Sequence, residues 1–297
     1  MGVGQTTHMR TLRRSKLFVP GNRSALFAKA IAGPADALSF DLEDAVPGQE
    51  KSSARATVAE FLRTCPATAK ELIVRVNSLE SGLMIEDLLA LACAGLNVIK
   101  VPKVESPRDL HVADAVLGHA ERKLGMVPGT IGLMPTLESP AGLRRAHEIA
   151  TATPRVVALQ LGTGDLKAAT GLVPDTARLN AVRTMLLLAA AEAGVDALDS
   201  AFVNIGDAAA FERDAMEARA LGFAGKSCIH PSQIAAANRI FSPTAVELDD
   251  ARQLLKAYEE AKARGIGAIA HRGNLVDHVH AMEARRLLQA AGDSSNA

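Results

Sequence analysis

The chain has 297 residues, and its 33 Lys and Arg balance 33 Asp and Glu to a formal net charge of zero at pH 7. This balance, with 48% hydrophobic residues, excludes an intrinsically disordered chain and a broadly basic nucleic-acid surface. Eight Phe, one Tyr and no Trp are too few to build a platform on which bases stack. No apolar run approaches the roughly 18 residues that cross a bilayer. We therefore expect neither a nucleic-acid partner nor a membrane partner.

The cysteines and the N-terminus indicate a cytoplasmic protein. Cys65, Cys93 and Cys228 are odd in number and far apart, which fits neither a disulfide framework nor a zinc site. Residues 1–16 are polar and basic without an apolar segment, so we expect no secretory signal. We expect residues 1–13 to form a disordered leader in a protein of the reducing cytoplasm.

Short apolar or β-branched runs alternate along the chain with longer helical patterns. The predicted strands cover residues 17–19, 37–42, 72–76, 98–101, 131–136, 156–161, 197–203 and 223–229. The helical patterns between them cover residues 24–32, 51–64, 82–94, 108–118, 141–152, 178–193 and 208–221. This alternation predicts an α/β fold, a closed (β/α)8 TIM barrel. A doubly wound sheet is the alternative, but no GxGxxG phosphate-binding fingerprint follows the first strand.

The pattern changes after Ser242-Pro243. One long helical pattern covers residues 246–264, a glycine-containing stretch follows, and a last helix is expected near residues 281–291. These elements exceed the eight strand and helix repeats of a barrel. We therefore expect the barrel to cover residues 14–242 and a helical C-terminal extension to cover residues 243–297.

Polar residues gather where the predicted strands end. In a (β/α)8 barrel the carboxyl ends of the strands and the loops after them build the active site. We therefore expect these side chains to converge at one end of the barrel: Asp41, Glu43, Asp44, Arg75, Asn77, Lys100, Lys103, Glu138, Asp165 and His230.

Glu138 and Asp165 form a candidate metal site. They lie 27 residues apart (165 − 138), which is about one β/α unit and places them at adjacent strand ends. Carboxylates without a His or Cys cluster are typical ligands of Mg²⁺ or Mn²⁺. The alternative is that Glu138, followed by Ser139-Pro140, only places a negative charge at a helix N-terminus.

Several short motifs, taken together, resemble the citrate lyase β-subunit-like proteins of the HpcH/HpaI aldolase superfamily. The resemblance covers residues 14 to about 290, with the motifs in the family's order. They are residues 14–23 (RSKLFVPGNR), 41–46 (DLEDAV) with Lys51 and Arg55, 74–77 (VRVN), 101–105 (VPKVE), 137–140 (LESP), 222–226 (GFAGK), 229–234 (IHPSQI) and 241–243 (FSP).

The resemblance implies a trimeric or hexameric (β/α)8 barrel that binds Mg²⁺ and cleaves or forms a carbon–carbon bond beside a CoA thioester. It implies that Glu138 and Asp165 hold the metal, with Glu138 also meeting the substrate. It implies that Arg75 binds the substrate's carboxylate or the enolate oxygen. Phe18, Arg23 and Lys29 match positions that contact CoA.

Residues 273–277 (GNLVD) resemble the family's lid, whose acidic residue reaches the active site of a neighbouring subunit. The resemblance implies that Asp277 is an acid/base acting in trans. The alternative is that Asp277 merely begins the last helix. Three positions depart from the family's usual pattern: Gly164 before Asp165, Arg272 before the lid, and Val279 where relatives often carry proline.

The leading hypothesis is a Mg²⁺-dependent lyase of a short 3-hydroxyacyl-CoA such as malyl-CoA, methylmalyl-CoA or citramalyl-CoA. An alternative is a citrate lyase β subunit that acts on a citryl thioester carried by an acyl carrier protein. A third hypothesis, from another class, is a non-catalytic protein that binds CoA or an acyl carrier. A pyruvate aldolase without CoA is disfavoured because the three CoA-contact positions match.

Overall fold

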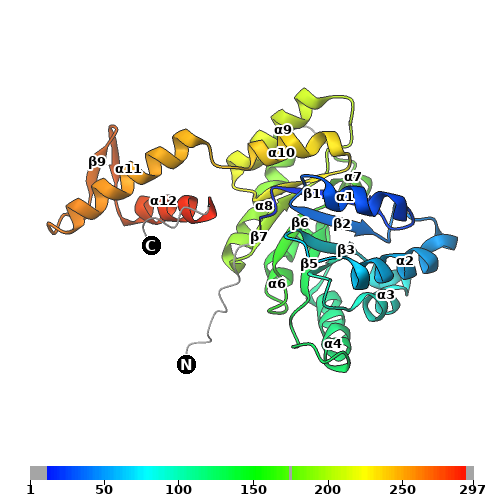
Figure 1. The fold of residues 1–297 in the computed structure, drawn as a ribbon. Helices are drawn as coiled ribbons and strands as arrows, with labels where there is room; N and C mark the ends of the chain where they lie inside the picture. Colours follow the sequence, from blue (N-terminus) through cyan, green and yellow to red (C-terminus); the bar gives the residue numbers. More distant parts are fainter. Residues whose placement is uncertain (1–11, 174–175, 292–297) are drawn as a thin grey trace. The chain divides into compact units, whose positions relative to one another are not determined.

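In the computed structural model, which describes residues 12–173 and 176–291, eight parallel strands close into a barrel in chain order (Figure 1). The strands are β1 (Ser15–Pro20), β2 (Ala37–Asp41), β3 (Glu71–Arg75), β4 (Val98–Val101), β5 (Gly132–Leu137), β6 (Ala158–Leu161), β7 (Asp196–Asp199) and β8 (Gly225–Cys228). β1 pairs with both β2 and β8, which closes the sheet. The predicted (β/α)8 barrel is confirmed.

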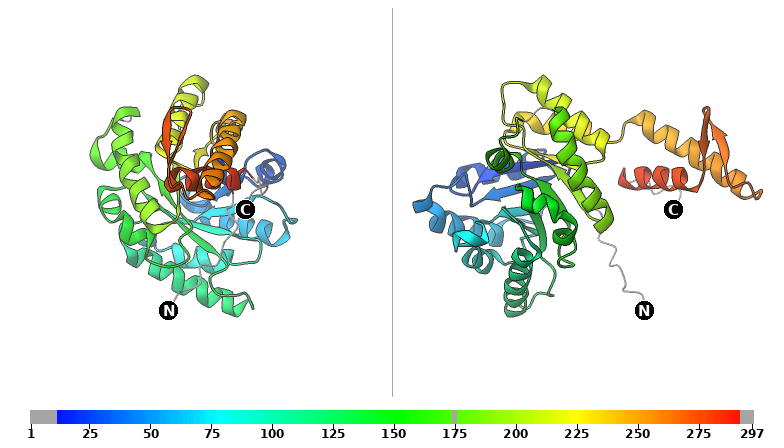
Figure 2. Two further views of the ribbon diagram at one scale, coloured as in Figure 1. Left: turned by 90° about the vertical axis from the view of Figure 1, so that its left-hand side faces the viewer. Right: turned by 180° about the vertical axis from the view of Figure 1, so that it is seen from behind.

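Helices follow the strands and cover the outside of the barrel (Figures 1 and 2). They are α1 (Phe27–Ala32), α2 (Lys51–Thr64), α3 (Met84–Leu91), α4 (Pro107–Lys123), α5 (Pro140–Arg144), α6 (Ala146–Ala150), α7 (Thr163–Thr170), α8 (Thr176–Ala193), α9 (Ala208–Leu221) and α10 (Ile234–Ile240). Short 3₁₀ turns lie at η1 (Ser24–Leu26), η2 (Gly48–Glu50), η3 (Leu79–Ser81) and η4 (Pro231–Gln233). The helices α7 and α10 are absent from the elements that the sequence predicted.

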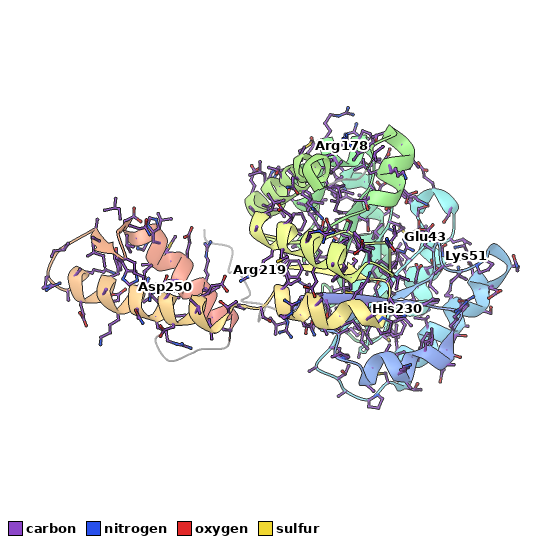
Figure 3. All side chains as sticks on the ribbon, turned by 90° about the horizontal axis from the view of Figure 1, so that it is seen from above. Glu43, Lys51, Arg178, Arg219, His230 and Asp250 are labelled. Atoms are coloured by element: carbon purple, nitrogen blue, oxygen red, sulfur yellow. The ribbon has the colours of Figure 1, made fainter. Side chains whose placement is uncertain are left out.

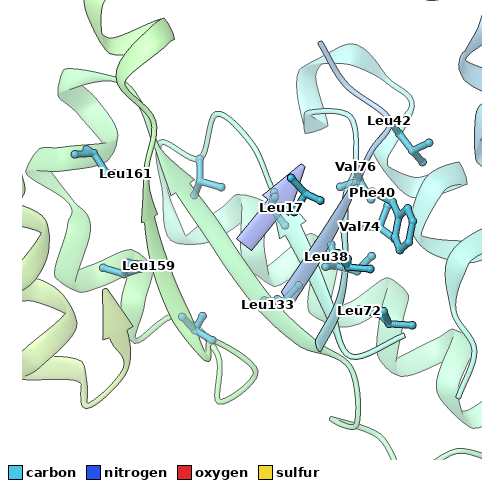
Figure 4. Close-up of a cluster of buried hydrophobic side chains, with 14 of the residues drawn as sticks. Leu17, Leu38, Phe40, Leu42, Leu72, Val74, Val76, Leu133, Leu159 and Leu161 are labelled. Atoms are coloured by element: carbon cyan, nitrogen blue, oxygen red, sulfur yellow. The ribbon is translucent and has the colours of Figure 1, made fainter. Parts of the chain in front are cut away.

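The main core lies between the strands and the helices. Because successive strand residues point to opposite faces, alternate residues face the helical layer, and along β2 to β6 these residues are apolar. Leu38, Phe40, Leu72, Val74 and their neighbours fill this space (Figure 4). The ring of Phe40 meets that of Phe27 edge-on, with 4.9 Å between centroids.

The residues between these positions point into the barrel. An apolar layer closes its interior towards the amino ends of the strands, and its members are buried: Ala37, Ile73, Val98, Met134, Ala158 and Leu198. The next inward residue along β3 is Arg75 and along β4 is Lys100. The strand ends therefore carry polar side chains above an apolar floor.

The N-terminal leader was predicted to extend to residue 13. Its residues 1–11 lie outside the described part of the chain. Arg13, however, is buried, and its guanidinium donates to both carboxylate oxygens of Glu71 at 2.8 and 2.6 Å and to Asp196 at 2.7 Å. Arg13 therefore belongs to the ordered barrel, because its charge is matched at the first residues of β3 and β7.

Contacts divide the chain between Phe241 and Ser242. The described part of the second unit contains α11 (Ala245–Lys262), β9 (Ile269–His271), β10 (Asn274–Val276) and α12 (His278–Ala290). The strands form an antiparallel hairpin whose two turn residues, Arg272 and Gly273, have φ of 47° and 83°. Buried Leu255, Tyr258 and Ala281 give α11 and α12 a shared core of their own.

No helix among residues 12–173 and 176–291 has the length and apolar character needed to cross a membrane.

Candidate active site

Arg75, the last residue of β3, stands at the centre of a charged cluster. Its guanidinium meets both carboxylate oxygens of Asp41 at 2.6 Å. Its Nη1 atom lies 2.9 Å from Glu43 and 3.0 Å from Asp44. The Asp41 side chain is buried, and the arginine holds its pKa below the ordinary value even though burial alone would raise it. The cluster therefore keeps Arg75 and Asp41 charged.

The loop after β2, which carries Glu43 and Asp44, is fixed by Lys51 of α2. The Lys51 ammonium donates to the carbonyl oxygens of Leu42 and Glu43 at 2.9 Å each and to Asn77 Oδ1 at 2.6 Å. Figure 3 labels Glu43 and Lys51, which lie near each other. All three lysine donors are used, so the lysine ties the ends of β2 and β3 together.

Glu138 follows β5 and is 5% exposed. Its Oε1 atom accepts a hydrogen bond of 2.6 Å from the backbone N–H of Lys103. Lys103 has a φ of 52°, in the left-handed region that non-glycine residues seldom adopt. The residue whose N–H binds Glu138 therefore has an uncommon backbone conformation. The Lys103 ammonium lies 3.0 Å from Glu43. One residue thus joins the two carboxylates.

Gly162 provides the space that Glu138 occupies. A Cβ atom at Gly162 would lie 2.4 Å from Glu138 Oε2 and 2.6 Å from Glu138 Cβ, closer than atoms can approach. Gly162 is also the N-cap of α7, and Asp165 lies in the first turn of that helix, half-buried. The end of β6 therefore brings Asp165 to the side of the barrel where Glu138 lies.

The two carboxylates suit a hard cation. Burial raises the pKa of Glu138, Lys100 counteracts this, and the negative charges of Glu43 and Asp165 raise it further. A divalent cation between Glu138 and Asp165 would relieve this repulsion, and oxygen donors are those that Mg²⁺ prefers. Within the described residues no group of three or more His, Cys, Asp or Glu side chains has the arrangement of a metal site.

Phe18 points into the barrel from β1 and is half-buried. Three cations surround its ring: Lys100 Nζ lies 4.5 Å from the centroid, and Lys16 Nζ and Arg75 Cζ each lie 5.2 Å from it. Lys16 is fully buried and hydrogen-bonds to Gln160 Oε1. Burial and the neighbouring cations lower its pKa well below the ordinary lysine value.

The structure brings Phe18, Arg75 and Glu138 to one end of the barrel, with Asp165 close enough to influence Glu138 electrostatically. Arg23 and Lys29 follow β1, and both are exposed. Asp277 lies in the second unit. Its Oδ1 atom accepts from the N–H of Val279 at 2.9 Å and lies 2.8 Å from His280 Nδ1. The Asp277 side chain is thus the N-cap of α12.

Three contributors to the site were not predicted as such. Lys16 lies within the motif of residues 14–23, and Gln160 lies within the predicted strand 156–161, but neither was given a role. Gly162 follows that predicted strand and was given none either. Lys16 and Gln160 could have been found from the inward alternation of their strands. Gly162 carries no comparable signal, because its importance depends on a side chain 24 residues away.

Comparisons with known proteins agree with this geometry. The model of the HpcH/HpaI aldolase/citrate lyase family matches residues 14–231. The citrate lyase subunit beta of Leuconostoc mesenteroides subsp. cremoris is 39% identical over 284 residues, covering 94% of this chain and 93% of that protein. The L-malyl-CoA/beta-methylmalyl-CoA lyase of Cereibacter sphaeroides is 33% identical, covering 94% of each.

A solved structure is also similar to this chain. Protein CitE of Mycobacterium tuberculosis, in complex with magnesium, acetoacetate and coenzyme A, has a TM-score of 0.75 and 31% identity, covering 94% of this chain and 97% of that one. The motifs, the barrel and the extent of these matches lead to the same result. The chain belongs to the HpcH/HpaI aldolase/citrate lyase family, a family of carbon–carbon lyases.

Proposed function

We propose that this protein is a Mg²⁺-dependent lyase that cleaves or forms a short 3-hydroxyacyl-CoA thioester. The observation that carries the proposal is the buried Glu138, set against Gly162 and influenced by Asp165, beside the Arg75 cluster. The relatives named as citrate lyase subunit beta and malyl-CoA lyase support the same chemistry. The CitE complex with magnesium and coenzyme A supports the metal and the thioester.

In this proposal Glu138 and Asp165 hold the ion. When bound, Mg²⁺ supplies Lewis acidity towards the hydroxyl and carboxylate oxygens of the substrate. The hydroxyl gives up its proton, the electron pair of the carbon–carbon bond moves to the thioester fragment as an enolate, and a proton then adds to that carbon. The products are an oxo acid and a shorter acyl-CoA.

Arg75 is placed to stabilise the negative charge of the substrate. Three carboxylates already contact its guanidinium, and a substrate oxygen that takes the place of one of them would gain the strongest contact. Asp44 is the one to leave, because its side chain is 57% exposed and an exposed ion pair contributes little free energy. The doubly bound Asp41 stays and keeps the guanidinium in position.

Asp277 is the proposed group that moves the proton, acting on the active site of a neighbouring subunit. The hydrogen bond from His280 lowers the pKa of Asp277, which keeps it a carboxylate at neutral pH. Phe18, Arg23 and Lys29 are proposed to contact CoA. The exposed Arg23 and Lys29 can meet its phosphates as charged donors.

The direct test is incubation of the purified protein, with and without Mg²⁺, with malyl-, β-methylmalyl-, citramalyl- and citryl-CoA. We expect one thioester to be cleaved only with Mg²⁺, and the E138Q variant to be slower by about 1,000-fold, since it removes a metal ligand. Absence of cleavage with all four, while CoA still binds, would contradict this proposal and favour a carrier-linked substrate or a non-catalytic binding protein.

A second candidate is the β subunit of citrate lyase, acting on a citryl thioester of an acyl carrier protein. The 39% identity with a citrate lyase subunit beta, against 33% with a malyl-CoA lyase, favours it. Cleavage of the carrier-linked thioester at a higher kcat/KM than citryl-CoA would identify this function. Equal or better use of a free CoA thioester would exclude it.

A further inference from the structure

The cations at the carboxyl ends of β2, β3 and β4 differ in how their charge is matched. Arg75 contacts Asp41, Glu43 and Asp44. Lys103 pairs with Glu43, and Lys51 donates to two carbonyl oxygens and to Asn77. These three cations have their partners within the protein.

Lys100 does not. It is 3% exposed, and within the described part of the chain no carboxylate forms an ion pair with its ammonium. Its neighbours across the sheet are Arg75 on β3 and Met134 on β5, neither of which is a counter-ion. Its Nζ atom lies 4.5 Å from the centroid of the Phe18 ring, and Lys16 is a further neighbouring lysine. An aromatic face compensates a buried ammonium only in part.

Lys100 points into the barrel because it lies two residues after Val98, which belongs to the apolar floor. The carboxylates of Glu138, Asp41 and Glu43 favour its charged form at longer range, while Arg75 opposes it. Lys100 is thus an inward cation one layer above the apolar floor, within electrostatic reach of the proposed metal ligand Glu138. An anion held beside Glu138 would meet this ammonium.

We propose that Lys100 binds the carboxylate of the small oxo acid, or the same carboxylate within the 3-hydroxyacyl thioester from which the acid is released. This inference rests on the proposed function, because it requires the acid to be held beside Glu138 and Asp165. An ammonium is a compact charge with three donors, so it can take one carboxylate oxygen while the ion takes the other. Lys100 then selects substrates that carry a free carboxylate at this end over simple 3-hydroxyacyl thioesters.

The test uses the full chain, with Mg²⁺, pyruvate and CoA titrated separately by calorimetry, pyruvate at saturating Mg²⁺. The variant is K100M, which keeps the length and burial of the side chain but removes its charge. The matched control is K123M, at an exposed lysine in the last turn of α4. Thermal unfolding of each variant reports on folding, and we expect K100M to be at least as stable as the wild type, since it replaces a buried unpaired charge.

We expect K100M to bind pyruvate about tenfold more weakly, or worse, because it loses a charge-assisted hydrogen bond. Its affinities for Mg²⁺ and CoA should not fall, and K123M should match the wild type in all three titrations. Equal pyruvate binding by K100M and the wild type would overturn the inference and leave the proposed function standing. Loss of Mg²⁺ binding together with pyruvate would assign Lys100 a structural role and also overturn it. Failure of the wild type to bind pyruvate with Mg²⁺ would overturn both.

Discussion

A methyl group on Gly162 would occupy the space that the Glu138 side chain fills. We therefore predict that G162A weakens Mg²⁺ binding by about tenfold or more, since displaced supports of a metal ligand typically cost that much. The barrel should still fold, because the contacts closer than 3 Å are with the Glu138 side chain alone, at the end of a strand, and the next neighbour, Thr136 Cγ2, lies 3.0 Å away. Mg²⁺ titration of the purified variant measures the effect.

The control for this change is the substitution G164A, two residues further along the chain. A Cβ atom on Gly164 would meet no other atom within 4 Å. G164A should therefore bind Mg²⁺ like the wild type, with equal or slightly greater stability. If the two variants bind Mg²⁺ equally well, the Gly162 contact does not position a metal ligand.

A buried ionic network joins the elements α8, β7, β8 and α9. Arg183 donates to Asp199 at 3.0 and 2.7 Å and to Asp214 at 2.7 Å, and Lys226 pairs with both carboxylates. Arg183, Asp199 and Lys226 have no exposed surface. The two positive and two negative charges balance, so the network links four elements without leaving a buried charge unmatched.

We predict that D214N destabilises the protein by about 3 kcal/mol at neutral pH, because it leaves two buried cations with one carboxylate. Lys226 and Arg183 lower the pKa of Asp214 against the effect of burial. A carboxyl whose pKa is lowered by folding stabilises the protein above about pH 4, and this contribution is lost as the pH falls through the folded-state pKa. Chemical unfolding of D214N should therefore depend less on pH in the acid range. Exposed Glu60 of α2, away from this network, supplies the control: E60Q should unfold as the wild type does at every pH.

At the level of elements, the sequence could predict those whose periodicity is long or flanked by clear signals. The pattern of α2 over 51–64 and of α9 over 208–221 coincides with the helices observed. The helix α7 was missed because Gly162-Thr163-Gly164 is typical of a loop. The strands β9 and β10 have three residues each, which is too short for alternation to be recognised.

The candidate site, like the elements, could be predicted only in part. Strand ends and motifs identify Arg75, Glu138 and Asp165, since the barrel topology brings strand ends together. They do not reveal that Arg75 has three carboxylate partners, while Lys100 forms an ion pair with no carboxylate of residues 12–173 and 176–291. Pairing depends on distances between layers of inward side chains, and those distances follow only from the packed barrel.

On the scale of the whole molecule, the role of Asp277 can be tested by mixing variants. D277N removes the carboxylate but keeps a good N-cap for α12, since Asn and Asp cap helices equally well. We predict that D277N and E138Q are each inactive as pure proteins. Activity should return when the two are unfolded together and refolded, because mixed assemblies contain sites with an intact Glu138 and a neighbour's intact Asp277. Mixtures as inactive as their components would exclude action in trans.

The apolar floor of the barrel, formed by Ala37, Ile73, Val98, Met134, Ala158 and Leu198, closes the interior beneath the proposed site. If the acid binds beside Lys100 and CoA binds at the exposed Arg23 and Lys29, the acid lies deeper than the thioester and departs after the acyl-CoA product. Release is then ordered, and the acid, as the last product to leave, should inhibit competitively against the thioester substrate. Noncompetitive inhibition by the acid would show that the order is reversed. The closed base of the barrel would in this way set the kinetic sequence of the reaction.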